Sequence, residues 1–504
     1  MLAKYFVMGL SLIWGAGVVS AAQSFTVVVY NVENLHDADG VAVYDDYQPD
    51  HYRPAHVVTK VSNIAAILQK FRGGAGPDIV MLQEIEIDQT PESRVGALED
   101  FVISARATPL SALSVDDGAR LAPEWKGAPA EAWLLKAMAD AGLSGYHVVV
   151  GSDAPAPDPS AGGRAIKCVT LTKFPVRAVR EHAISSARNI LEVEVEVEGQ
   201  TLFVFNNHWK SGASDPSMET LRIENATVLR RRLDEILTTD PQADIVVGGD
   251  FNAQYNQKPR YPDMPRTSIN DVLKAQGSET ALQTGAADFY NLWYELEPEQ
   301  RGSDVYRGEW GTLMHLVVSR GLYDEAGVQY QDNSFRVARL MGVNADLAGA
   351  PRRWDSSGPG GSGFSDHLPT YAHFRTVDSG LRDKWMALDH PSDAVPTANV
   401  LRVNYAGADL NQAIDVASLP DSVDLKDGSW RGKLFKVRGT SISDGRNLKV
   451  RTGGVIYDVY APPRDVRDVL QAQHTRNRVF EFYGELGTYK GNWQFVVHDI
   501  SWVR

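Results

Sequence analysis

The chain has 504 residues, of which 43% are apolar and 23% charged, the balance of a soluble globular protein of two to three domains. Cys168 is the only cysteine, which excludes a disulfide scaffold within the chain and a cysteine-based zinc site. The formal net charge is −14, yet residues 431–504 hold 13 Lys and Arg against 7 Asp and Glu. An acidic body with a basic end predicts two modules with different roles.

The first 22 residues have the pattern of a secretory signal peptide. Lys4 precedes an apolar stretch at 5–19, and the small residues Ala21 and Ala22 follow it. We therefore predict a signal peptide at 1–22, a mature chain from Gln23, and a secreted or periplasmic protein without a stable membrane anchor. No cysteine follows the apolar stretch, so a lipid anchor is not expected. The alternative is a single uncleaved N-terminal anchor.

Residues 23–376 alternate between strand-like and helix-like segments, which predicts sheets covered by helices. Short β-branched and apolar runs predict strands at 25–30, 78–82, 146–150, 165–172, 190–197, 201–206, 244–247 and 313–319. Apolar residues at helical spacing predict helices at 57–71, 130–141 and 218–237. The segment 90–130 is interpreted as an insertion, and Gly- and Pro-rich loops are expected at 154–163 and 351–363.

Polar residues follow several of these strands at the point where each strand ends. They are Asn31, Gln83 with Glu84, Asn207 with His208, and Asp250 with Asn252, and Ser365, Asp366 and His367 follow the second Gly-rich loop. A single Asn after a strand is usually a turn residue, and a single Glu is usually solvated. Five such endings together indicate a site along one edge of a sheet.

The chemistry of these side chains indicates a metal-assisted reaction on a phosphoester. Carboxylate and amide oxygens suit Mg²⁺, Mn²⁺ or Ca²⁺ rather than zinc. Histidines among carboxylates suit proton transfer or contacts with phosphate oxygens. A cation to neutralise charge and a base to orient water are what attack on a phosphoester requires.

Five short motifs in order carry a resemblance to a known family. They are YNVEN at 30–34, LQEIE at 82–86, NNHWKS at 206–211, GGDFNA at 248–253 and SDHLP at 365–369. Together they resemble the endonuclease/exonuclease/phosphatase superfamily over residues 25–375, in the form of secreted bacterial nucleases with an added C-terminal domain. The resemblance implies an α+β fold for residues 23–376, a two-sheet α/β sandwich with flanking helices.

The resemblance also implies which residues hold the metal and activate water. Glu84 would hold the catalytic Mg²⁺, with Mn²⁺ or Ca²⁺ as alternatives, and Asn31 would lie beside it. Asp366 would assist this metal or a second one. Asp250 would orient or deprotonate the attacking water, and Asn252 would steady the water and the phosphorane.

The same resemblance implies a set of phosphate contacts. His208 and Asn207 would bind phosphate oxygens, and His367 would contact the scissile phosphate as a cation. Further phosphate-binding candidates are Lys210, Arg164 and Arg188.

Two positions depart from the family pattern. Relatives usually have an Asp that hydrogen-bonds the catalytic histidine where this chain has Met314, and often an Asp where it has Lys167. Methionine cannot fix the tautomer of a histidine ring, and losing such a partner typically lowers activity by roughly 10–100-fold. We therefore expect a working enzyme that is slow or shifted in substrate, with a catalytically impaired binding protein as the alternative.

The C-terminal part predicts a linker at 377–429, which partly packs on the body, and a second domain at 430–504. Strand-like runs at 434–441, 448–451 and 455–460, a helix at 464–473, and strands at 479–486 and 493–503 follow the order of an OB-fold, a small β-barrel. Its basic charge suits a nucleic-acid backbone, with Tyr489 and Trp493 as candidate stacking residues. The alternatives are aromatic residues that fill the barrel and a barrel that docks on the acidic body.

Taken together, these patterns predict a secreted, divalent-metal-dependent phosphodiesterase that acts as a DNA or RNA endonuclease. The alternatives are hydrolysis of a small phosphoester, such as a phospholipid or sugar phosphate, and a binding protein on the same fold. The sequence leaves open the choice between DNA and RNA, endo- or exo-cleavage, the number of metals and the oligomeric state.

Overall fold

The computed structural model describes residues 23–90, 97–113, 123–151, 164–420, 422–427, 430–444, 447–473, 478–489 and 492–504. The predicted signal peptide at 1–22 lies outside these ranges, as does the whole of the loop predicted at 154–163. Within the described ranges, no helix has the length and apolar character that crossing a membrane requires.

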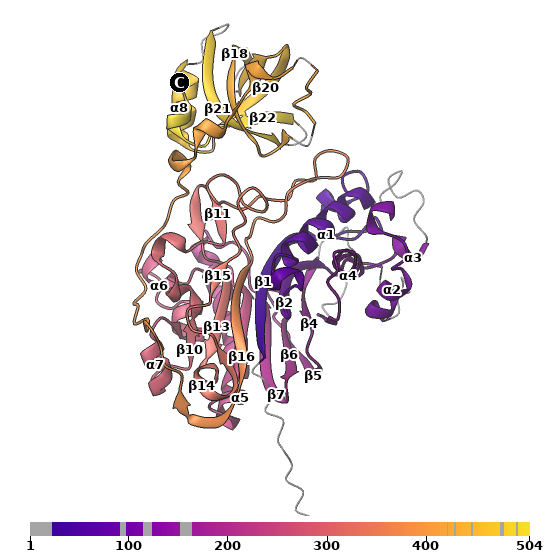
Figure 1. The fold of residues 1–504 in the computed structure, drawn as a ribbon. Helices are drawn as coiled ribbons and strands as arrows, with labels where there is room; N and C mark the ends of the chain where they lie inside the picture. Colours follow the sequence, from indigo (N-terminus) through magenta and orange to yellow (C-terminus); the bar gives the residue numbers. More distant parts are fainter. Residues whose placement is uncertain are drawn as a thin grey trace, which may run out of the picture.

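Two seven-stranded sheets form the body of the molecule (Figure 1). The first runs in the order β14 (Asp324–Tyr330), β16 (Thr370–Trp385), β1 (Ser24–Leu35), β2 (Ile79–Glu86), β4 (Ile166–Thr172) and β3 (His147–Val150), with β15 (Arg336–Val337) on β16. The second runs in the order β5 (Val176–His182), β6 (Ile190–Val197), β7 (Gln200–His208), β8 (Ile245–Asp250), β13 (Met314–Ser319), β10 (Phe289–Asn291) and β9 (Ala275–Gln276). The hairpin β11 (Asp304–Tyr306) and β12 (Glu309–Gly311) stands apart from both sheets.

Helices cover the outer faces of this sandwich. Side chains of α1 (Pro54–Leu68) and α4 (Ala130–Asp140) share a hydrophobic core with the first sheet, and those of α5 (Glu219–Thr239) share one with the second. The shorter helices are α2 (Leu98–Ser104), α3 (Pro123–Lys126), α6 (Gln257–Arg260) and α7 (Glu279–Thr284).

The layering follows from the alternation of side chains along each strand. In β1, Val28 and Tyr30 pack with the helices, whereas Val27 and Val29 pack in the core between the sheets. In β8, Val246 faces the other sheet and its neighbours pack toward α5. Because both faces of these strands are buried, their sequences are continuous apolar runs. The predicted two-sheet sandwich with flanking helices is confirmed.

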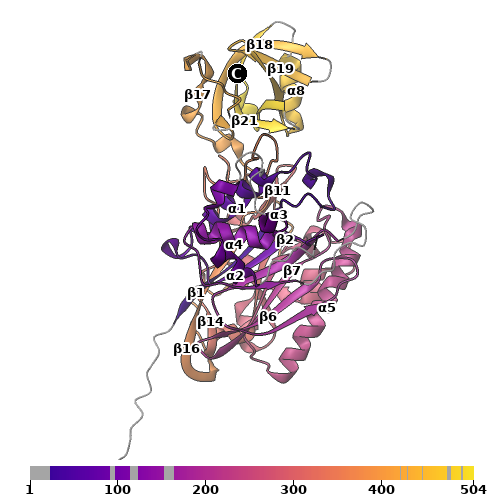
Figure 2. The same cartoon turned by 90° about the vertical axis from the view of Figure 1, so that its right-hand side faces the viewer.

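A closed five-stranded barrel forms the C-terminal domain (Figure 2). Its elements are β18 (Leu434–Asp444), β19 (Asn447–Thr452), β20 (Val455–Tyr460), α8 (Arg464–Gln473), β21 (Val479–Tyr489) and β22 (Asn492–Val496). β20 pairs with β22 in parallel, and β18 pairs with β21, which closes the barrel in the strand order of an OB-fold. The predicted small barrel is therefore also confirmed.

The segment between the two domains is more structured than a linker. β16 continues past the predicted domain end at residue 376 to Trp385, paired with β14. Farther on, β17 (Ile414–Asp415) pairs with β18 of the barrel. The sequence did not predict these strands, because pairing with a distant strand leaves no periodic signal in the sequence. The prolines of this segment suggested a linker instead. Tyr405 joins the domains, since its hydroxyl donates to Asp346 at 2.7 Å.

Candidate active site

The polar strand ends meet at one edge of the sandwich because their strands run in parallel. β1 pairs with β2 and β7 pairs with β8 in parallel, so each pair brings its carboxyl ends to the same edge. Asn31 lies opposite Gln83 in the first sheet, and His208 lies opposite Asp250 in the second. The edge on which the predicted residues lie thus follows from strand direction alone.

The local backbone at this edge needs residues in the left-handed region. Gly249 has φ +137°, and a Cβ there would lie 1.9 Å from the carbonyl oxygen of Asn207. Only glycine fits so close to the neighbouring strand. Glu84 and Asn252 also have positive φ, 64° and 49°, which is uncommon for residues with a side chain and occurs at functional sites.

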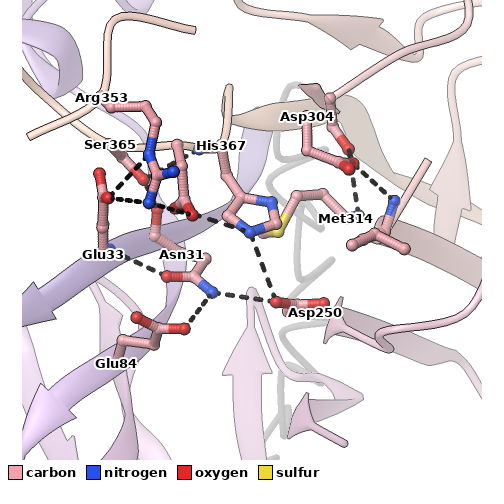
Figure 3. Close-up of polar contacts among 12 residues, drawn as sticks. Asn31, Glu33, Glu84, Asp250, Asp304, Met314, Arg353, Ser365 and His367 are labelled. Carbon is pink, nitrogen blue, oxygen red and sulfur yellow. Dashed lines mark hydrogen bonds and ion pairs between the residues drawn. The ribbon is translucent and has the colours of Figure 1, made fainter. Parts of the chain in front are cut away.

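Asn31 lies between the two central carboxylates (Figure 3). Its amide nitrogen donates to Glu84 at 2.9 Å and to Asp250 at 3.0 Å, and its oxygen accepts from the backbone of Glu33 at 2.9 Å. Asn31 therefore presents its nitrogen to the carboxylates. Ligand atoms of Glu84, His208 and Asp250 lie within 4.8 Å of one another, so this donor set fits a divalent cation.

The two histidines of the site have opposite electrostatic surroundings. His208 lies 3.6 Å from Glu84 and 3.7 Å from Asp250, and burial, with Arg188 nearby, lowers its pKa well below the usual value. Burial also opposes the charged form of His367, but Asp366, Asp250 and other carboxylates outweigh it and raise its pKa to about 9. In this cluster His208 is neutral at pH 7, and His367 is a cation.

A carboxylate that sequence reasoning missed lies beside His367. Asp304, at the start of β11, forms a backbone bridge with His367, and its charge helps to raise the pKa of that ring. Nδ1 of His367 is buried and has no hydrogen-bond partner among the described residues. Figure 3 shows the Asp304 carboxylate on the side of the ring away from Asp250. Met314 adjoins the ring without offering a charge.

Arg353 is the second functional candidate that was missed. It lies in the Gly-rich loop predicted at 351–363, where it is 2.8 Å from Glu33 and 3.4 Å from Asp366 (Figure 3). Its side chain is 68% exposed, so its guanidinium can reach a ligand. The Gly-rich sequence of the loop did not predict this role, because the two carboxylates that Arg353 pairs with come from other segments of the chain.

Six of the predicted residues line one cavity of about 610 Å³: Glu84, His208, Asp250, Asn252, Asp366 and His367. Asp304 and Arg353 line it as well. Ser365 fixes the last predicted motif to β1, because its hydroxyl donates to the carbonyl of Asn31 at 2.7 Å. The five motifs are thereby brought to a single site.

Three other predicted residues lie outside this cavity, and two of them have their side-chain polar atoms engaged elsewhere. The Asn207 side chain is buried and donates to the carbonyls of Phe205 and Gly248. Arg164 bonds to Asn189 at 3.0 Å. Lys210, Arg164 and Asn207 do not line the catalytic cavity. Their predicted phosphate contacts gain no support from this placement.

Two further basic residues, Arg188 and Lys167, each have a partner in the structure. Arg188 donates to the carbonyl of Trp209 at 3.3 Å, and its charge acts on both Glu84 and His208. Lys167 is buried and pairs with Glu131 of α4 at 3.2 Å. The positive charge that departs from the family pattern is therefore paired with a negative charge within the fold.

The barrel approaches the end of the sandwich that carries the site (Figure 1). A second cavity of about 1200 Å³ lies between the domains, and Arg353, Asp366 and Tyr489 are among the residues that line it. Tyr489 is 63% exposed. The guanidinium of Arg431 lies over the Trp493 ring, 5.5 Å from the centre of that ring. Arg431 also pairs with Asp355 at 3.6 Å, so Trp493 supports the domain contact.

Residues 168–376 match the Endonuclease/Exonuclease/phosphatase family. This match covers less than half of the chain and indicates a hydrolase fold, which suggests a phosphoesterase. The family typically uses a divalent metal, and the structure contains acidic and histidine clusters that could hold one. No curated protein matches the sequence.

Solved structures of several proteins are similar to this chain at low identity. TDP2 from C. elegans is 13% identical, with 70% of this chain and 75% of that chain covered and a TM-score of 0.37. D. rerio TDP2 complexed with single strand DNA product is 13% identical, with 70% and 99% covered and a TM-score of 0.38. A family protein from Bacteroides thetaiotaomicron is 14% identical, with 71% and 96% covered and a TM-score of 0.38.

Proposed function

We propose that the protein is a divalent-metal-dependent phosphodiesterase that cuts nucleic acid. The observation that carries this proposal is the convergence of the strand-end carboxylates, amides and histidines on one cavity. Glu84 and Asp250 are held together by the amide of Asn31. Phosphoester hydrolysis needs this combination of a metal-binding carboxylate, a base and a cationic group.

Each group has a defined role in this mechanism. A divalent cation held by Glu84, in the cluster with His208 and Asp250 and with Asp366 assisting, would neutralise charge on the phosphate. Asp250 orients a water molecule and accepts one of its protons as the water oxygen bonds to phosphorus. Asn252 hydrogen-bonds to the water or the phosphate. The bond from phosphorus to the leaving oxygen breaks, and the leaving oxygen takes up a proton from solvent.

His367 stabilises the negative charge that develops on the phosphate oxygens, and Asp304 acts through it as a positioning residue. The Asp304 carboxylate lies on the side of the ring away from Asp250 (Figure 3), where Nδ1 has no hydrogen bond, and its negative charge favours the charged form of the imidazole. In this way a residue of the β11–β12 hairpin takes the role that Met314 cannot fill.

The wall of the cavity favours a nucleic acid over a small phosphoester. Arg260, Arg307 and Arg353 line it together with Tyr261 and Tyr306. The Arg307 guanidinium lies over the Tyr306 ring at 5.0 Å, and Tyr306 is 53% exposed. Exposed aromatic rings beside cationic groups can stack bases and bind neighbouring phosphates.

The proposal is tested by incubating purified mature protein with circular plasmid DNA and single-stranded RNA, with Mg²⁺, Mn²⁺, Ca²⁺ or chelator. We expect metal-dependent nicking of plasmid that Glu84→Ala abolishes, which also excludes a contaminating nuclease. Glu299→Gln, at an exposed glutamate that does not line the cavity, is the matched carboxylate control and should retain activity.

Two outcomes would overturn the proposal. If folded protein leaves both polymers intact but releases phosphate from lipid or sugar phosphates, the substrate is a small phosphoester. If it cleaves nothing yet retains DNA or RNA in a binding assay, the protein is a binding protein on this fold. Exo-cleavage would appear as loss of linear DNA with intact circles and would correct only the mode of attack.

We further propose that the protein is exported and that its barrel holds the nucleic acid near the site. The predicted signal peptide supports export. The basic charge of residues 431–504 and the exposed Tyr489 in the cavity between the domains support the second role. The variant Tyr489→Ala removes this aromatic ring from the barrel. It should weaken the binding of a long nucleic-acid strand without changing the cleavage of a dinucleotide.

A further inference from the structure

A second group of acidic residues lies far from the catalytic cavity. Glu279 begins α7, Glu295 ends the short helix Leu292–Glu295, and Asp332 follows β14. In Figure 1, α7 and β14 lie at the end of the sandwich away from the barrel. We call Glu279, Glu295 and Asp332, with Tyr290 of β10, the lower cluster. Nothing in the proposed reaction uses it.

The three carboxylates converge closely. Each offers an oxygen that lies within 4.8 Å of the others. The hydroxyl of Tyr323 donates to Glu279 at 2.7 Å, and that of Tyr330 donates to Glu295 at 2.5 Å. These two bonds satisfy one oxygen on each glutamate and fix the direction of the carboxylates, but they supply no positive charge.

Several buried polar atoms in this cluster have no partner. Glu295 Oε1, Asp332 Oδ1 and the hydroxyl of Tyr290 are buried without a hydrogen bond in the described part of the chain. Tyr290 is fully buried, and the charges of all three acids act on its hydroxyl. Buried polar atoms left unpaired in this way usually have a bound water or ion as their partner.

The charge of the cluster is also uncompensated. Across the described ranges, no Lys or Arg forms an ion pair with Glu279, Glu295 or Asp332. Three acids in contact therefore need either shared protons or a cation.

We propose that the lower cluster is a calcium site. Its donors are all oxygens, which hard cations prefer, and Ca²⁺ accepts six to eight oxygen ligands in flexible geometry. The free oxygens of Glu295 and Asp332 and an oxygen of Glu279 provide three ligands, and Tyr290 can donate a hydrogen bond to a water that completes the shell. Asp332 and Tyr330 line a cavity of about 920 Å³, which gives the ion a path from solvent.

Calcium here would hold the chain that leads to the barrel. The backbone N–H of Ser392 donates to Glu279 at 2.8 Å, and that of Glu279 donates to the Ser392 carbonyl at 2.8 Å. The backbone N–H of Asp389 contacts Asp332 at 3.4 Å. This segment follows β16 and precedes the barrel, so an ion bound to Glu279 and Asp332 would fix both of its contacts with the body.

The test compares metal binding by two matched variants of the full mature chain. Glu295→Gln removes a ligand charge, and Glu299→Gln changes an exposed glutamate four residues away in the same way. Both carry Glu84→Gln, which disables the catalytic metal site. Binding of Ca²⁺ is measured by titration calorimetry, and Tb³⁺ luminescence excited through tyrosine reports an ion beside Tyr290, Tyr323 and Tyr330.

We expect the Glu299→Gln protein to bind one more Ca²⁺ than the Glu295→Gln protein, or to bind it at least about tenfold more tightly, and to give the stronger Tb³⁺ signal. Acidic groups elsewhere are the same in both variants, so any Ca²⁺ that they bind does not contribute to the difference. Equal binding by the two folded proteins would overturn the proposal and indicate shared protons instead. Should Glu295→Gln not fold, Asp332→Asn is compared with Glu299→Gln under the same criteria. The outcome is independent of the proposed nuclease activity.

Discussion

Replacing Asp304 by Asn tests whether this carboxylate positions His367. The change keeps the oxygen that accepts from the Leu313 backbone at 3.1 Å and from Ser303 at 3.0 Å, so the hairpin should remain folded. It removes the negative charge beside the ring. We expect kcat to fall by about 10–100-fold, which corresponds to about 1.4–2.8 kcal/mol of transition-state stabilisation, with little change in KM.

The assay is metal-dependent cleavage of a fluorescent oligonucleotide by Asp304→Asn, with Glu299→Gln, at an exposed glutamate outside the cavity, as the control. The pH profile of kcat is measured for both, because the loss of a neighbouring negative charge should shift the profile of Asp304→Asn to lower pH, whereas a purely structural defect would lower activity at every pH. An unchanged kcat in folded Asp304→Asn protein would refute the positioning role. Met314→Asp should give no gain, because it buries a second acid directly opposite Asp250.

Three further predictions concern substrate binding, stability and export. Tyr306→Ala should raise KM for an oligonucleotide by about 5–150-fold while sparing a dinucleotide, since one stacked base contributes about 1–3 kcal/mol, and steady-state kinetics on both substrates check this. Glu192→Gln should lower the free energy of unfolding by about 1–2 kcal/mol at pH 7, because bonds to His182 and Arg232 outweigh burial and depress the Glu192 pKa to about 2. That loss should vanish as pH falls from about 4.5 toward 2, where the wild-type carboxylate is itself protonated, and urea unfolding at several pH values measures it. Mass spectrometry of protein recovered from the medium or periplasm should give a chain that begins at Gln23, and a retained N-terminus would contradict the signal peptide.

Strands with both faces buried could be predicted from the sequence, whereas several others could not. The apolar runs of β1 and β8 gave a direct signal. β5 and β16 were missed, since β5 (VRAVREH) lies at a sheet edge and β16 continues through polar residues (TVDSGLRDK) that pair with β14. Pairing with a distant partner determines such strands, and no local pattern records it.

The site shows the same division. The motif residues Glu84, Asp250 and His367 could be predicted because each motif lies at the end of a strand whose direction brings it to the common edge. Asn207 lies in a motif too, but alternation along β7 turns its side chain away from the cavity, toward Gly248. A motif predicts which strand end is functional. The alternation of side chains along the strand then determines which residues of the motif face the cavity.

Asp304 shows why a missing motif residue does not by itself mean lost chemistry. Met314 occupies the strand position from which relatives supply a carboxylate, and the segment between β10 and β13 has no periodic pattern that would predict a replacement. The fold nevertheless returns this segment to the site, since the Leu368 backbone bonds to the Ser303 carbonyl at 2.6 Å and Asp304 bridges to His367. A charge interacts through space, so His367 needs a carboxylate near its ring and not one from a particular strand. The substitution at Met314 is therefore compatible with an active enzyme.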